Sequence, residues 1–211
     1  MNLPTKTLER KMLADGYKYV IGVDEVGMAC LAGPVYVCAV SLTKEFFEKS
    51  HKNLSRLRDS KQLLPHQREK FYDELRKERG IKYQLASCSP ATIDKINIYQ
   101  ASRLAMRRAI TKLRPSHKSI VLVDGNKKIR GVGLPQKAIV GGDRKIFAIA
   151  CASIIAKVTR DRLMTRLAKR YPQYGLEKHK GYPTKLHKTM LAQHGICEIH
   201  RKSFAPVANL L

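Results

Sequence analysis

Two apolar runs joined by a short glycine-containing turn constrain the fold of this chain most strongly. The first run, Lys18 to Val23, leads into two adjacent carboxylates, Asp24 and Glu25, and the second covers Pro34 to Val40. Runs of this length and composition predict buried strands. Adjacent acids at the end of a buried strand repel each other and resist desolvation, so a divalent metal ion is a natural partner for them. The alternative is that both acids only cap a turn.

The charge of the chain predicts a polyanionic partner. Its 211 residues include 41 lysines and arginines against 17 acids, a formal net charge of +24. Nucleic acid is the first candidate and an anionic membrane surface the second, because solubility alone does not require so one-sided a balance. Hydrophobic residues make up 44% of the chain, enough for one domain with a sizeable core, and there is no tryptophan for broad stacking platforms.

The cysteines and the first residues indicate a cytoplasmic protein. The five cysteines are odd in number, form no CxxC pair and in several cases lie in apolar runs, so we expect reduced core thiols and no structural zinc site. Residues 1–13 are charged and contain no signal-peptide core. The longest apolar stretch, Met28 to Val40, is too short to span a bilayer. We therefore expect no membrane partner.

Strands come first in succession and then alternate with helices, which predicts a mixed α/β sheet with helices on both faces. Pro65 is placed to begin a helix, and Ser89 to cap one. The small apolar residues of 146–156 predict a buried helix that packs closely. The expected strands are 18–23, 34–40, 81–87, 119–123 and 137–140; the expected helices are 5–15, 66–79, 90–113 and 143–170, with short polar segments over 42–63.

Two further acids stand at comparable places. Asp124 follows the fourth expected strand, and Asp161 lies in the late helix. If the first and fourth strands are neighbours, Asp24 and Asp124 project from adjacent strand ends, where open α/β sheets form their active sites. Asp124 also suits an ordinary Asp-Gly turn, and Asp161, four residues after Lys157, also suits a surface ion pair. Four converging carboxylates favour two Mg²⁺ or Mn²⁺ ions that serve phosphodiester hydrolysis.

Six motifs in order resemble the type 2 ribonuclease H family (ribonuclease HII), and the resemblance covers nearly the whole chain. They are G-V-D-E-V-G at 22–27 with L-A-G-P-V at 31–35, D-S-K at 59–61, V-D-G at 123–125, the stretch from G-D at 142 through A-S-I-I-A-K-V-T-R-D to Met164, H-K-G-Y at 179–182 and H-R-x-S-F at 200–204. The resemblance implies an RNase H-like fold, a five-stranded mixed sheet flanked by helices. It places a catalytic domain over 1–170 and a basic helical extension over 171–211, packed together as a single structural unit.

The same resemblance implies an endoribonuclease with Mn²⁺ or Mg²⁺ as its cofactor. It would hydrolyse the RNA strand of RNA/DNA hybrids and cut 5′ of ribonucleotides embedded in duplex DNA, by two-metal-ion hydrolysis that leaves 3′-hydroxyl and 5′-phosphate ends. Reading one ribonucleotide in DNA depends on its 2′-hydroxyl. The implied catalytic metal ligands are Asp24, Glu25, Asp124 and Asp161. The implied substrate contacts are Gly27, Met28 and Ala29 in the turn, Ser60 and Lys61 at phosphates, and Tyr182 stacked at the RNA-to-DNA step.

The turn departs from the family pattern. Gly27-Met28-Ala29 stands where the family usually has G-R-G, and Cys30 replaces the usual proline. Met28 removes a guanidinium and its fork of donors. If φ is positive at Ala29, its Cβ costs roughly 1 kcal/mol. Because the backbone amides remain, cleavage is expected to persist with a weaker preference for a single embedded ribonucleotide.

The basic tail contains three histidines, His179, His187 and His200, which are read as phosphate contacts or as core hydrogen-bonding groups. Arg144 and Lys145 suit either phosphate binding or a solvated helix face. A type 3 ribonuclease H would need an additional N-terminal domain, and type 1 enzymes place their glutamate on a helix. A non-enzymatic basic nucleic-acid-binding protein would explain the charge but not the four acids. A monomer is expected, and the sequence assigns no sliding-clamp partner.

Overall fold

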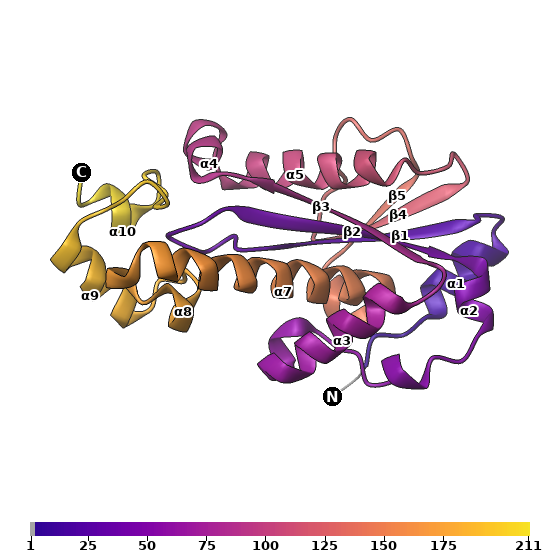
Figure 1. The fold of residues 1–211 in the computed structure, drawn as a ribbon. Helices are drawn as coiled ribbons and strands as arrows, with labels where there is room; N and C mark the ends of the chain where they lie inside the picture. The colour runs from indigo at the N-terminus through magenta and orange to yellow at the C-terminus, as the bar shows by residue number, and fades with distance from the viewer. Residues whose placement is uncertain (1–2) are drawn as a thin grey trace.

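The computed structural model describes residues 3–211 and places five strands in one mixed sheet (Figure 1). The strand order is β3-β2-β1-β4-β5, with β1 antiparallel to β2 and parallel to β4. The predicted mixed sheet is therefore confirmed, and each expected strand lies close to its predicted bounds. The strands are β1 Tyr19–Val26, β2 Val35–Thr43, β3 Ile81–Cys88, β4 Ser119–Asp124 and β5 Gln136–Ile139.

Helices cover both faces of the sheet (Figure 1). Helices α4 and α5 lie on one face, while α7 crosses the other face with α1 and α3 beside it, and α8 to α10 gather around the C-terminal end of α7. The helices are α1 Thr7–Ala14, α2 Lys44–Glu48, α3 Pro65–Lys77, α4 Pro90–Ile96, α5 Ile98–Leu113, α6 Gly142–Lys145, α7 Phe147–Arg170, α8 Leu176–His179, α9 Lys185–His194 and α10 Ala205–Ala208; short 3₁₀ turns cover Lys52–Leu54, Ser60–Gln62 and Pro172–Tyr174.

Helix α7 approaches β1 so closely that their backbones touch. A Cβ atom on Gly22 would lie 2.2 Å from the carbonyl carbon of Ala148 and 2.3 Å from its oxygen. Every residue from Phe147 to Ala156 is buried. The predicted buried, closely packed helix is confirmed, and the missing side chain of Gly22 is what permits the contact.

Two helices that the sequence predicts as continuous are interrupted. The helix expected over 90–113 breaks at Asn97, whose φ is +62° and whose side chain caps α5 by accepting from Gln100 N at 3.0 Å. The helix expected over 143–170 breaks at Ile146, which is extended and pairs with Thr5. Phe147 N donates to Thr5 O at 3.1 Å, so the N-terminal segment provides a hydrogen-bond acceptor for the first amide of α7.

Other local predictions are confirmed. Helix α3 begins at Pro65, and the Ser89 side chain accepts from Thr92 N at the start of α4. All five cysteines are free thiols, and four of them are buried. Within residues 3–211, none of the helices combines the length and the apolar character needed to cross a membrane.

We expect Gly22→Ala to destabilise the fold by about 1–3 kcal/mol or more, because the added methyl group forces α7 away from β1. Urea denaturation would measure the change. Gly133→Ala is the matched control, because a Cβ there meets nothing within 4 Å and the residue has no positive φ. Equal free energies of unfolding for the two variants would contradict the prediction.

Candidate active site

Parallel pairing brings two of the predicted acids to the same edge of the sheet. The register of β1 and β4 pairs Val23 with Val123. Asp24 and Asp124 are the next residues on the two strands, so they lie side by side at the carboxyl ends, where α/β folds form active sites. The condition on which the sequence argument depended, that the first and fourth strands are neighbours, is met.

Asp24 is the most confined of these acids. Its side chain is 4% exposed, and its Oδ1 accepts from the backbone N–H of Glu25 at 2.8 Å. Burial raises the pKa of Asp24 well above its usual value, and the negative charges of Glu25 and Asp124 raise it further. The hydroxyl of Ser153 on α7 opposes this rise. A carboxylate held in this way is stabilised by a cation.

Glu25 and Asp124 are also buried beside other carboxylates. Burial, followed by the charge of Asp124, raises the pKa of Glu25 to about 7. Burial also raises the pKa of Asp124, although the Gly142 N–H, which donates to its Oδ1 at 2.7 Å, acts against this. Glu25 Oε2 is buried without a hydrogen-bond partner. Oxygen ligands that repel one another and leave an oxygen unsatisfied fit a hard divalent cation. Among residues 3–211, the acidic, histidine and cysteine side chains do not stand as a ready-made metal cage, so such an ion would have to draw them together.

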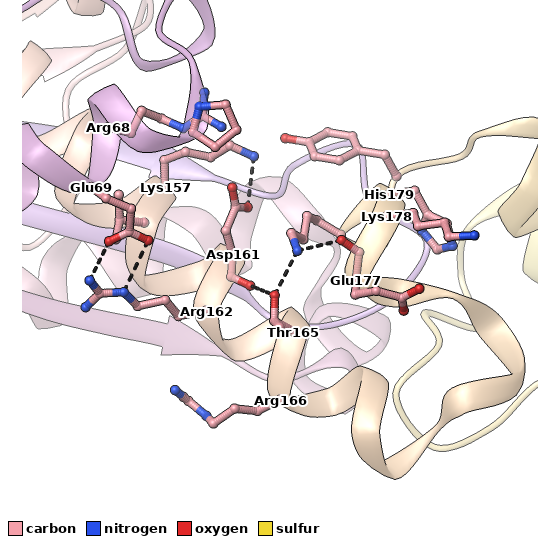
Figure 2. Close-up of a pocket in the computed structure, with 14 residues that line it drawn as sticks. Arg68, Glu69, Lys157, Asp161, Arg162, Thr165, Arg166, Glu177, Lys178 and His179 are labelled. Carbon is pink, nitrogen blue, oxygen red and sulfur yellow. Dashed lines mark hydrogen bonds and ion pairs between the residues drawn. The ribbon is translucent and has the colours of Figure 1, made fainter.

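Asp161 lies apart from this cluster. It is on α7 eight residues beyond Ser153, about 12 Å further along the helix. Its Oδ1 accepts from Lys157 Nζ at 2.9 Å (Figure 2). The ion pair that the sequence offers as the alternative to a catalytic role is therefore present. Asp161 lines a cleft of about 780 Å³ between α3, α7 and the loop that carries Tyr182. Its assignment as a metal ligand stays a prediction.

Lys61 and Asp143 border the acidic cluster. The Lys61 side chain is 69% exposed, and its Nζ lies 3.3 Å from Asp143 Oδ2. Burial acts to lower the pKa of Lys61, but the charges of Asp143 and Asp59 outweigh it and raise the pKa. Asp143 also raises the pKa of Asp24 and of Asp124. Sequence reasoning did not assign a role to Asp143, although the G-D dipeptide was part of a motif.

The other residues predicted near phosphates point elsewhere. Ser60 is 3% exposed, and its hydroxyl hydrogen bonds to that of Ser153 at 3.0 Å. Arg144 Nε donates to the buried Asp59 at 3.2 Å, and Lys145 Nζ donates to Val140 O at 2.8 Å. Ser60 therefore supports Ser153, which lies beside Asp24. A phosphate contact from Ser60 stays a prediction.

Two buried arginines, Arg160 and Arg201, contact the predicted substrate turn of Gly27, Met28 and Ala29. Gly27 has a φ of +93°, and a Cβ there would lie 2.5 Å from Arg160 Nε. Ala29 is exposed, and it is not among the non-glycine residues of 3–211 with positive φ, so the backbone penalty considered for it does not arise. The carbonyl of Met28 accepts from Arg201 at 3.1 Å. At position 29 the turn therefore has an ordinary backbone conformation and an added methyl group where the family usually has glycine.

Arg160 and Arg201 are fully buried and donate to backbone carbonyls. Arg160 reaches Pro34 O, Ala32 O and Lys180 O at 2.9–3.0 Å. Arg201 Nε reaches Gly33 O at 3.0 Å, and burial lowers the pKa of Arg201 to about 10. These two side chains, which the sequence did not single out, fasten the turn to the C-terminal part of the chain.

Tyr182 is positioned by the buried histidines. Cys197 N donates to His200 Nδ1, so His200 carries its proton on Nε2, which faces His187 Nε2 at 3.3 Å. His187 then donates from Nδ1 to Tyr182 O at 3.0 Å. Burial lowers the pKa of both His187 and His200 to about 4, so both are neutral. His179 stacks on His187, and all three histidines have the structural role that was weighed against phosphate contact.

Comparison with known proteins places these features in one family. The model of the family described as Ribonuclease HII matches residues 21–207. The ribonuclease HII of Caldicellulosiruptor saccharolyticus is 49% identical over 197 residues, covering 93% of this chain and 92% of that protein. The crystal structure of the ribonuclease H2 from Pyrococcus horikoshii matches with a TM-score of 0.73 and 26% identity, over 91% of this chain and 96% of the other. The ribonuclease HII in the PCNA complex from Archaeoglobus fulgidus matches with a TM-score of 0.69 and 27% identity, over 88% of this chain and 94% of the other.

We expect Glu25→Gln to stabilise the metal-free protein at neutral and higher pH. The folded-state pKa of Glu25 is raised from 4.5 to about 7, so its favourable contribution is complete below pH 4.5 and is lost as the pH rises through 7. Removing the charge should therefore raise the free energy of unfolding by up to about 3 kcal/mol near pH 8, with little change near pH 4.

Urea denaturation in the presence of a chelator would measure this effect at both pH values. Glu48→Gln is the matched control, because its side chain is 60% exposed and its substitution should stay within about 0.5 kcal/mol. A Glu25→Gln protein no more stable than the wild type near pH 8 would contradict the prediction.

Proposed function

The chain belongs to the ribonuclease HII family and is an endoribonuclease that acts on RNA/DNA hybrids, and from this premise we propose that it also cuts 5′ of single ribonucleotides embedded in duplex DNA. The products would carry 3′-hydroxyl and 5′-phosphate ends. The observation that carries the site assignment is the group of crowded acids at the ends of β1 and β4, with one buried glutamate oxygen left without a partner.

Asp24, Glu25 and Asp124 would hold Mg²⁺ or Mn²⁺, with Asp161 as the fourth carboxylate. When bound, a pair of divalent ions supplies Lewis-acid activation of the attacking water and charge stabilisation for the departing oxygen. Asp161, which lies apart from the other three acids, would have to leave its ion pair with Lys157 and move toward them for this role. Ser153 holds Asp24 from the α7 side, and Gly142 N holds Asp124 from the start of α6.

The remaining predicted residues would position the substrate. Lys61, with its exposed ammonium group beside Asp143, would contact a phosphate next to the acids. Tyr182 and the turn of Gly27, Met28 and Ala29 would flank the reactive ribonucleotide. A backbone hydrogen bond from Leu31 N to Gly181 O joins the turn to the tyrosine loop. The protein would act as a monomer in the cytoplasm, with nucleic acid as its partner and without a membrane partner.

We expect the purified protein to cut two of three labelled duplexes in Mg²⁺ or Mn²⁺. It should cut a DNA duplex that contains a single ribonucleotide and a full RNA/DNA hybrid, and it should leave an all-DNA duplex uncut. Asp124→Asn should abolish cleavage, because it removes a charge from the metal-binding group, while leaving binding measurable. Cleavage of the hybrid alone would reject the single-ribonucleotide activity. Loss of all cleavage with binding intact would favour the non-enzymatic alternative.

We expect the double variant Met28→Arg/Ala29→Gly to prefer the single ribonucleotide more strongly than the wild type. An arginine restores a fork of donors beside the 2′-hydroxyl, and hydrogen bonds from a charged group contribute about 1.5–3 kcal/mol, or roughly ten- to a hundredfold in relative kcat/KM. The measurement is the ratio of kcat/KM on the single-ribonucleotide duplex to that on the hybrid. Equal or better discrimination by the wild type would overturn this expectation.

A further inference from the structure

A second hollow, on the opposite face of the sheet from α7, contains only one sign of charge. It has a volume of about 530 Å³ and lies between α5 and the loop after β4. Its charged lining consists of Arg103, Arg107, Lys127, Lys128 and Arg130, with no acid among the lining residues. Within residues 3–211, none of these five side chains forms an ion pair. We call these five residues and the space between them the basic groove.

The cleft that contains Asp161 offers a contrast within the same molecule. Its lining includes Glu69, Asp161 and Glu177, and its cations Lys157 and Arg162 are paired with two of those acids (Figure 2). Six lysines and arginines line that cleft against three acids, so its positive charge is compensated in part. In the basic groove the cations stay uncompensated, and an unneutralised cluster of this kind attracts a polyanion.

The shape of the basic groove is fixed by its own hydrogen bonds. The Arg103 guanidinium donates to Lys127 O at 2.8 Å and to Lys128 O at 2.7 Å, which ties the loop to α5. Gly131 lies against Arg107, with only 3.0 Å available for a Cβ before the guanidinium. The side chains of Arg107, Lys127, Lys128 and Arg130 are exposed around this fixed frame. The groove is therefore formed before any ligand arrives.

The basic groove opens beside the candidate active site. Lys127 follows Asp124 by three residues, and Arg103 ties this loop to α5 through its hydrogen bond to Lys127 O. A polymer cut at the ends of β1 and β4 could extend directly into the groove. The only apolar lining residues, Ile96 and Leu104, are half-buried, so the groove lacks the apolar face with which a helix enters a membrane surface.

We propose that the basic groove binds the sugar-phosphate backbone of the substrate duplex beyond the cleavage point. The inference rests on the proposed function, because it takes the acids of β1 and β4 as the place of cutting. Lysine and arginine contacts to phosphates fix position without reading sequence. The groove therefore adds affinity for long duplexes and leaves the choice of the cleaved ribonucleotide to the turn and Tyr182.

The test is binding of Arg107→Gln/Lys128→Gln to two hybrid duplexes, one of roughly one helical turn and one of roughly three turns. Fluorescence anisotropy in a chelator, at several salt concentrations, gives the affinity without cleavage. Each lost phosphate contact lowers the slope of log affinity against log salt by about 0.9, so the slope for the long duplex should fall by about 2. Affinity for the short duplex should fall less than affinity for the long duplex, because fewer of its phosphates reach the groove.

Lys11→Gln/Lys18→Gln is the matched control. It removes the same charge from exposed residues before β1, at the end of that strand away from Asp24, and should keep the wild-type slope on both duplexes. A wild-type slope in the Arg107→Gln/Lys128→Gln protein, or an equal loss in the control, would overturn the proposal. If the wild type shows the expected binding but cuts no duplex, the proposed function fails while the basic groove stands.

Discussion

The contact between Gly22 and the backbone of Ala148 sets the geometry on which the candidate site depends. From that point both elements run toward the same edge of the sheet. Two strand residues advance about 6.6 Å to Asp24, and five helix residues advance about 7.5 Å to Ser153. The close approach therefore places the Ser153 hydroxyl level with the Asp24 carboxylate. Any side chain at position 22 would lift α7 away and separate the two groups.

Placing acids at that edge costs stability in the absence of a cation. Burial raises the pKa of Asp24, Glu25 and Asp124, and the charges of neighbouring carboxylates raise each pKa further. The other charges of the chain are overwhelmingly positive. Yet the surrounding cations remain outside the cluster: Lys61 pairs with Asp143, and Arg103 is engaged by the carbonyls of the loop after β4. The protein thus keeps its positive charge near enough to attract a polyanion, while leaving the acids free for a metal ion. Functional sites commonly hold groups that repel one another, so the folded protein is less stable where its activity requires those groups.

The mixed sheet and the order of its elements along the chain could be predicted because apolar runs and turn residues carry that information locally. The pairing of β1 with β4 joins segments about a hundred residues apart, so the sequence offered it only as a condition. The two helix breaks could not be predicted. At Asn97 the helical periodicity continues across the break, and only the side-chain cap reveals it. At Ile146 the cause is a partner more than a hundred residues away, Thr5. Arg160 and Arg201 were missed for a related reason: in sequence they are two cations among 41 lysines and arginines, and only burial against distant carbonyls sets them apart.

Those arginines also determine what the altered turn can change. Arg160 holds carbonyls of residues 32, 34 and 180, so one side chain fixes the turn and the tyrosine loop relative to each other. Gly27 and Gly181 are needed for this frame, since a Cβ at either would collide with Arg160 or with Ala32 O at 2.5–2.6 Å. Position 28 contributes its carbonyl to the frame, and Ala29 is exposed. The substitutions at 28 and 29 therefore alter the groups that the turn presents to a substrate, whereas the interactions that hold the turn depend on backbone atoms that any residue supplies.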